Sequence, residues 1–147
     1  MPEYPEDMNG LARQRTELAR QRNLLALERT FEEYGLPMNR ETVLLYRSIN
    51  KRAWEEFEKG LITQEALRST RFERLFERLR LTRDPEEVST FYLARLAEGA
   101  FLIEKALQVL KAAASVCVCC IITNGIADVQ HKRFAASPLP PYLRGLV

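Results

Sequence analysis

The spacing of hydrophobic and polar positions predicts a chain built mainly of amphipathic helices. Apolar residues recur at intervals of three and four, with charged residues between them, which is the pattern of a helix that packs one face against a core. The predicted helices span residues 9–34, 39–60, 63–79, 84–99 and 101–114. Because short loops join them, the first four are expected to form a compact helical bundle.

Local signals mark the ends of these helices. Thr63 is a predicted N-cap, and Asp84 followed by Pro85 is the strongest helix start in the chain. Glycines, which tolerate the left-handed backbone that often ends a helix, follow three of the predicted helices: Gly35, Gly60 and Gly99. On the outward face of the helix after Thr63, five charged residues are expected to face water: Arg71, Glu73, Arg74, Glu77 and Arg78.

A different pattern appears near the carboxyl end. Residues 116–122 form an uncharged run of Val, Cys and Ile that stops at Thr123-Asn124-Gly125, and a helical pattern follows from Ile126 to Ala136. The run predicts a strand buried on both faces, as in a parallel sheet. A hydroxyl and a glycine turn between a strand and a helix N-terminus are typical of phosphate sites in α/β proteins. On the residues alone, the N-cap of the following helix is the favoured role of Thr123.

Composition excludes several functions. The 147 residues fit one domain, and a net charge of +2 does not favour nucleic acid or an anionic membrane as a partner. Glutamates interrupt the arginines of the first helix, which indicates a solvated face. No apolar stretch reaches the roughly 18 residues of a membrane span. The acidic, proline-bearing start is unlike a secretory signal, so a cytoplasmic protein is expected.

The cysteines and the single histidine raise a metal hypothesis. Cys117 and Cys119 would share one face of the predicted strand, with Cys120 on the other. Zinc sites more often use cysteines on loops with two to four other residues between them, so three buried apolar cysteines in a reducing compartment are the favoured interpretation. His131 has no neighbouring catalytic partner and is expected to be exposed or half-packed. No metal site is predicted.

Three stretches carry a resemblance to a known family. They are residues 26–37, residues 41–104, and Ile121–Gly125 with Gln130 following. Together they resemble the haloacid dehalogenase-like hydrolase superfamily, and most closely its pyrimidine 5′-nucleotidase branch. The resemblance implies a mainly α fold: the helical-bundle cap domain of such a hydrolase with a remnant βα unit of its Rossmann-like α/β core. The implied domains are a divergent N-terminal helical extension (1–24), the cap (25–100) and the partial core (101–147).

The family's chemistry maps only in part. Its second motif, a Ser or Thr that hydrogen-bonds the phosphoryl group, falls on Thr123, with Asn124 and Gly125 as the turn. Its first motif, Asp-x-Asp, supplies the nucleophile and helps hold Mg²⁺. The only three aspartates here are Asp7, Asp84 and Asp128, which are far apart. The resemblance implies a phosphatase of nucleoside 5′-monophosphates or other phosphate esters that uses Mg²⁺, but no catalytic residue and no Mg²⁺ ligand is found. A truncated chain that is inactive alone is therefore expected.

Two alternatives remain open. The heptad-spaced Leu11, Leu18 and Leu25 would suit a non-enzymatic helical module that associates with itself or a partner, although two heptads fall short of a coiled-coil argument. The exposed edge of a lone strand is a second route to self-association. Alternatively, a frameshift or an incorrect gene boundary would account for both ends of the chain.

Overall fold

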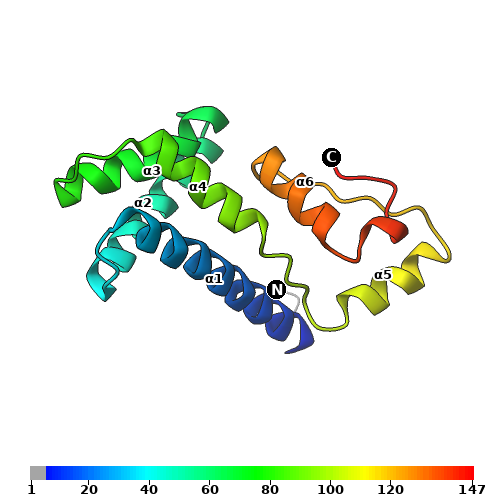
Figure 1. Ribbon diagram of the computed structural model, residues 1–147. Helices are drawn as coiled ribbons and strands as arrows, with labels where there is room; N and C mark the ends of the chain where they lie inside the picture. The colour runs from blue at the N-terminus through cyan, green and yellow to red at the C-terminus, as the bar shows by residue number, and fades with distance from the viewer. Residues whose placement is uncertain (1–5) are drawn as a thin grey trace. The chain divides into compact units, whose positions relative to one another are not determined.

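The computed structural model describes the backbone of residues 6–147, and the side chains of residue 10 and of residues 12–147. The described part is mainly helical, as predicted (Figure 1). The helices are α1 (Glu6–Tyr34), α2 (Arg40–Glu58), α3 (Gln64–Leu79), α4 (Pro85–Ala97), α5 (Ala106–Ala114), α6 (Ala127–Ala136) and the short 3₁₀ helix η1 (Pro140–Tyr142). The largest deviation is α5, which begins at Ala106 where the pattern predicts Phe101.

The predicted helix ends are confirmed by their hydrogen bonds. The Thr63 hydroxyl accepts from the Ala66 amide at 3.1 Å, and Asp84 Oδ1 accepts from the Glu86 amide at 2.9 Å. Gly35 and Gly60 follow α1 and α2 with φ of +61° and +70°, the left-handed region that side chains disfavour. Short-range chemistry therefore accounts for where α1 and α2 end and where α3 and α4 begin.

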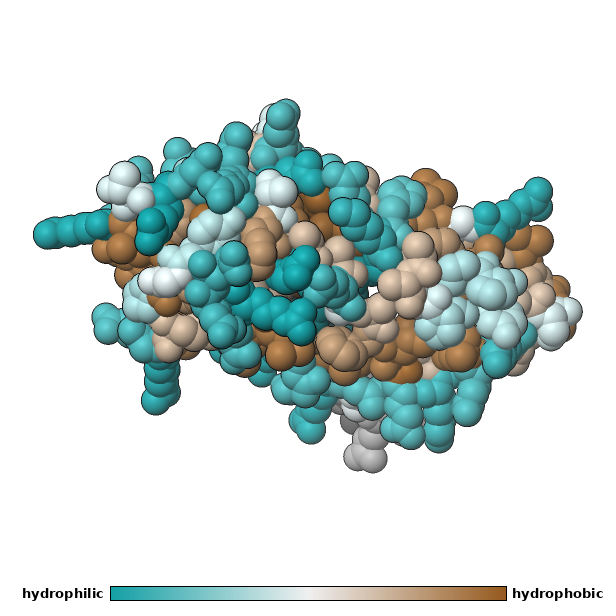
Figure 2. All heavy atoms as spheres, viewed as in Figure 1, coloured by the Kyte–Doolittle hydropathy of each residue, from teal (hydrophilic) through white to brown (hydrophobic). Residues whose placement is uncertain are grey.

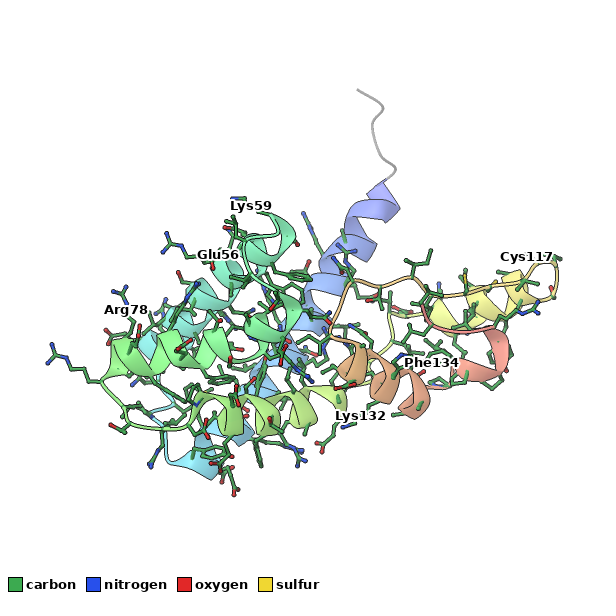
Figure 3. All side chains as sticks on the ribbon, turned by 90° about the horizontal axis from the view of Figure 1, so that it is seen from above. Glu56, Lys59, Arg78, Cys117, Lys132 and Phe134 are labelled. Carbon is green, nitrogen blue, oxygen red and sulfur yellow. The ribbon has the colours of Figure 1, made fainter. Side chains whose placement is uncertain are left out.

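The chain divides into two compact units, and residues Ala26–Arg95 form one of them. Its centre is an aromatic cluster in which Phe72 lies 5.6 Å from Tyr46 and 5.4 Å from Tyr92, measured between ring centroids. Phe72 is fully buried, and Tyr46 and Tyr92 are nearly so. Figure 3 labels Glu56 on the rim of this unit, where its carboxylate pairs with Arg74 at 2.7 Å and links α2 to α3.

Arg71 corrects the prediction of a fully solvated outer face on α3. Its side chain is only 2% exposed, with Nη1 donating to Asn50 Oδ1 at 3.2 Å and the guanidinium lying over the Tyr92 ring. Nε and Nη2 of Arg71 have no hydrogen-bond partner among the described residues. Charge alone suggested a surface position, but Arg71 packs into the core as a long side chain.

The other unit joins the described residues up to Leu25 with Leu96–Val147. Here the segment 119–123 runs parallel to 144–147, and one bridge pairs Ile121 with Leu146. The Ile121 amide donates to the Gly145 carbonyl at 3.0 Å, and the Val147 amide donates to the Ile121 carbonyl at 2.8 Å. The predicted βα unit is thus present as a short paired segment followed by α6.

The prediction that residues 116–122 are buried on both faces is wrong. Val116, Val118 and Ile122 are 84%, 71% and 82% exposed. Cys117 and Cys120 are exposed too, and Cys119 is half-buried. An apolar strand is buried only where other elements cover it, and only 144–147 pairs with this one in the described part of the chain. Apolar surface is visible over the region that holds α5 (Figure 2).

The heptad hypothesis finds no support in the side chains of α1. Leu18 is half-buried and Leu25 is 48% exposed, whereas the side chain of Leu11 lies outside the described residues. The two leucines thus differ in environment, and self-association stays a prediction. Within residues 6–147, no helix is both long enough and apolar enough to cross a bilayer.

Candidate functional site: the Thr123-Asn124-Gly125 turn

The paired segment determines the position of the turn. The Thr123 amide donates to the Val147 carbonyl at 2.9 Å, so Thr123 is the last residue held by the parallel pair. The next two residues turn the chain, and Ile126 precedes the first residue of α6. The turn therefore lies at the carboxyl end of a β segment and directly before a helix N-terminus, as the sequence predicts.

The Thr123 hydroxyl does not cap α6, which overturns the N-cap interpretation. It accepts instead from the Gly125 amide at 3.1 Å and closes the turn on itself. The N-cap residue of α6 is Ile126, whose side chain cannot accept a hydrogen bond. A hydroxyl that accepts one hydrogen bond still has its own proton to donate. The half-buried Thr123 can thus donate to an anion that approaches the turn.

Gln130 lies against the turn. A side chain added at Gly125 would overlap the Gln130 amide group, so glycine at 125 lets Gln130 approach. Gln130 also lines a cavity of about 180 Å³, together with other residues of the stretch 100–146, including Phe101, Ile121, Arg133, Phe134 and Leu146. The cavity is smaller than the roughly 300 Å³ of typical small-molecule sites. It would hold a small group rather than a whole nucleotide.

Arg133 is a cationic residue that the sequence analysis did not single out. Its Nε donates to the Gly99 carbonyl at 3.0 Å. Burial, with a smaller contribution from the charge of nearby Arg22, lowers the pKa of Arg133 to about 10, so the guanidinium stays charged at neutral pH. Its place one helical turn after Gln130 was a usable signal, because residues three apart share a helix face.

A second hollow, of about 660 Å³, lies between α2 and α3 of unit Ala26–Arg95. Its rim mixes cations such as Lys51, Arg52 and Arg78 with Glu55 and Glu77. Arg74 in this hollow is already paired with Glu56, and the hydrogen bond from Arg74 lowers the pKa of that carboxyl. Charges of both signs give this hollow no clear preference for a phosphate.

The residues of the turn do not fit Mg²⁺. This ion takes oxygen ligands in an octahedron and is usually held by carboxylates. Thr123 and Asn124 offer one hydroxyl and one amide, and Asp128 lies on α6 beyond the turn. Within residues 6–147, no three His, Cys, Asp or Glu side chains gather closely enough to hold a metal. His131 is exposed, as expected.

Comparison with known proteins places the chain in context. No protein-family model matches it. It is 30% identical over 122 residues to the HAD-hydrolase YfnB of Bacillus subtilis (strain 168), covering 83% of this chain and 52% of that protein. It is 30% identical over 121 residues to the pyrimidine 5′-nucleotidase YjjG of Escherichia coli (strain K12), covering 82% of this chain and 53% of that protein.

A solved structure supports the same relationship as the sequence comparisons. The crystal structure of YfnB from Bacillus subtilis, bound to magnesium, superposes with a TM-score of 0.81 at 28% identity, covering 87% of this chain and 57% of that one. The mainly α fold class with a helical cap is thereby confirmed. The chain spans about half the length of the curated relatives it matches. This chain is therefore related to the haloacid dehalogenase-like hydrolases over most of its own length, as its sequence predicts.

Proposed function

We propose that Thr123, Asn124 and Gly125 form the phosphate-holding turn of a haloacid dehalogenase-like phosphatase, and that these 147 residues alone do not complete its catalytic site. The observation that carries this proposal is the state of the Thr123 hydroxyl. It accepts from Gly125, leaves its proton to donate, and lies just before the N-terminus of α6. Backbone amides at a helix N-terminus and a donating hydroxyl suit a phosphoryl oxygen.

The substrate class follows from the relatives. A nucleoside 5′-monophosphate or a related phosphate ester is proposed, because one matched relative is a pyrimidine 5′-nucleotidase. The domain organisation proposed with it keeps residues 1–24 as an N-terminal extension, 25–100 as the cap and 101–147 as the partial core. A cytoplasmic location is part of the same proposal.

We expect no turnover by this chain because it lacks the carboxylates that the reaction needs. Covalent phosphoryl transfer by a carboxylate needs a nucleophile such as Asp next to the phosphate. The aspartates of the sequence do not supply an Asp-x-Asp pair, and Asp84 is occupied as the N-cap of α4. The proposed role of this chain is therefore to hold the phosphoryl group, with the nucleophile and the Mg²⁺ ligands lying outside these 147 residues.

Turnover and binding should be measured separately. The purified chain, incubated with Mg²⁺ and UMP, dUMP or p-nitrophenyl phosphate, should release no more phosphate than a boiled sample, with YjjG as the positive control. Steady turnover by this chain would contradict the proposed inactivity.

Phosphate binding is measured by titration and amide NMR, in which the amide signals of Thr123, Gly125 and Ile126 should shift. Thr123→Val, which keeps the shape but removes the hydroxyl, should abolish the saturable shift. If the wild-type chain and Thr123→Val show the same phosphate-induced shifts, Thr123 is not part of the binding site.

A further inference from the structure

The loop after α5 brings two thiols together. Cys117 Sγ and Cys119 Sγ are 3.7 Å apart, and Figure 3 shows Cys117 where the chain leaves α5. Cys117 is exposed and Cys119 half-buried, so small reagents in water can reach the pair. This exposure makes the two thiols available for reaction, whereas a buried thiol would be chemically inert.

The backbone on either side holds this pair in place. The Cys117 amide donates to the Ala113 carbonyl at 2.9 Å, and its thiol approaches the same oxygen at 3.1 Å. Two residues later, the Cys119 carbonyl accepts from the Arg144 amide at 2.8 Å. Cys117 is therefore anchored to the end of α5 and Cys119 to the parallel pair, while both side chains lie on the same side of the connecting segment.

We propose that Cys117 and Cys119 form a reversible dithiol–disulfide site that exchanges with small disulfides, and that Cys120 takes no part in it. A disulfide is about 2.05 Å long, so the two sulfurs must approach by about 1.7 Å, which side-chain rotation can supply. Cys120 follows Cys119 directly. Successive side chains of an extended segment point to opposite sides, so we expect Cys120 to lie on the side opposite Cys119.

The exchange balances in two steps. Cys117, the more exposed thiol, loses its proton and attacks one sulfur of a small disulfide such as oxidised glutathione, which breaks that bond and releases one glutathione thiolate. Cys119 then loses its proton, attacks the Cys117 sulfur and releases the second glutathione thiolate. The two thiolates take up the two protons. Two protein thiols are oxidised, and one small disulfide is reduced to two thiols.

The order of the steps agrees with the electrostatics of the pair. The hydrogen bond with Cys117, and then burial, raise the pKa of the Cys119 thiol. A thiol with a raised pKa holds less thiolate at neutral pH and is the slower attacker. Cys119 therefore suits the second, intramolecular step, where proximity compensates for low thiolate content. Because the pKa of Cys119 is raised, the rate of ring closure should still be rising with pH where an ordinary thiol is already fully deprotonated.

The test counts thiols. The reduced 147-residue chain is incubated without oxygen in oxidised glutathione, quenched with acid, alkylated with N-ethylmaleimide and mapped by mass spectrometry. Two thiols should disappear together as a Cys117–Cys119 disulfide, with Cys120 either alkylated or carrying a single glutathione, and dithiothreitol should restore all three. Disulfides that contain Cys120, links between chains, or three independent glutathione adducts without ring closure would each overturn the proposal.

Variants sharpen the assignment. The matched control Cys120→Ser should form the disulfide at the wild-type rate. Cys117→Ser and Cys119→Ser should each stop at a mixed glutathione disulfide, with circular dichroism confirming that both remain folded. Ring closure in either of these two variants would show that the pair is wrongly assigned. Because the wild-type map identifies the bond directly, the proposal stays testable even if a variant fails to fold.

Discussion

Unit Ala26–Arg95 and segment 116–147 use similar hydrophobic residues in opposite ways. In the first, side chains of helices far apart in sequence meet around Phe72, and the ring is fully buried. In the second, Val116, Ile122 and Val147 are each about four-fifths exposed. In the whole unit that contains this segment, which joins the residues up to Leu25 with Leu96–Val147, the buried hydrophobic residues among the described side chains are Ala97, Ile126 and Val129.

How far a hydrophobic side chain is buried depends on the number of elements that cover it. Removing apolar surface from water contributes about 25 cal/mol per Å², whatever the residue's secondary structure. Three amphipathic helices and the end of α1 supply enough mutual cover in unit Ala26–Arg95. A two-segment parallel pair with one following helix does not, because parallel strands are usually covered on both faces. The exposed cysteines follow directly from this lack of cover.

The largest expected effect on stability comes from truncating a hydrophobic side chain to alanine in each of the two regions. Phe72→Ala should lower the free energy of unfolding by about 3–5 kcal/mol, since it opens a cavity among Tyr46, Phe76 and Tyr92. Ile122→Ala removes a side chain that is 82% exposed and should change it by less than about 0.5 kcal/mol. Urea denaturation monitored by circular dichroism measures both. Similar losses would mean that residues 116–122 are covered after all.

Substitutions of Arg71 measure how much its buried charge lowers the stability of unit Ala26–Arg95. Arg71→Met keeps most of the volume and removes two unpartnered nitrogens, so the free energy of unfolding should rise by about 1–3 kcal/mol. Arg71→Ala, the matched control, should instead lower it, because it leaves a cavity. If both variants are equally destabilised, the contacts with Asn50 and the Tyr92 ring are strongly favourable.

Tyr46 makes the stability of the same core dependent on pH. Burial raises the pKa of Tyr46 well above its ordinary value near 10. At pH above about 10 the unfolded chain loses this proton and the folded chain keeps it, so folding stability should fall as pH rises, by up to about 1.4 kcal/mol per pH unit. Tyr46→Phe should reduce this slope in urea denaturation at several alkaline pH values. An unchanged slope would assign the effect to other groups.

The smallest effect concerns a helix end. Asp84→Ala should lower the free energy of unfolding by about 1 kcal/mol, since Asp84 caps the Glu86 amide at the start of α4. Asp84→Asn retains an acceptor and should stay close to wild type. Thermal unfolding of the three proteins compares them. Equal loss in both variants would indicate that the negative charge at the helix N-terminus matters more than the hydrogen bond.

Much of the helical part was predictable because its signals are short-range. Asn39, Thr63 and Asp84 each cap a helix through amides two or three residues away, and a left-handed glycine needs no partner from elsewhere in the chain. The role of Thr123 was harder to predict. A hydroxyl before a helix suits either an N-cap or a closed turn, and only the backbone path through Gly125 and Ile126 decides between them.

The sequence alone was enough to predict most ends of α1 to α4, the turn at residues 123–125 and the relation to the hydrolase family. Each of these depends on residue type at fixed, short spacing. The tertiary structure decided that Arg71 is buried, that Arg133 lies beside the turn's cavity, and that the three cysteines reach the surface. Burial is set by what other segments cover, and an apolar run such as 116–122 carries no information about whether that cover is present.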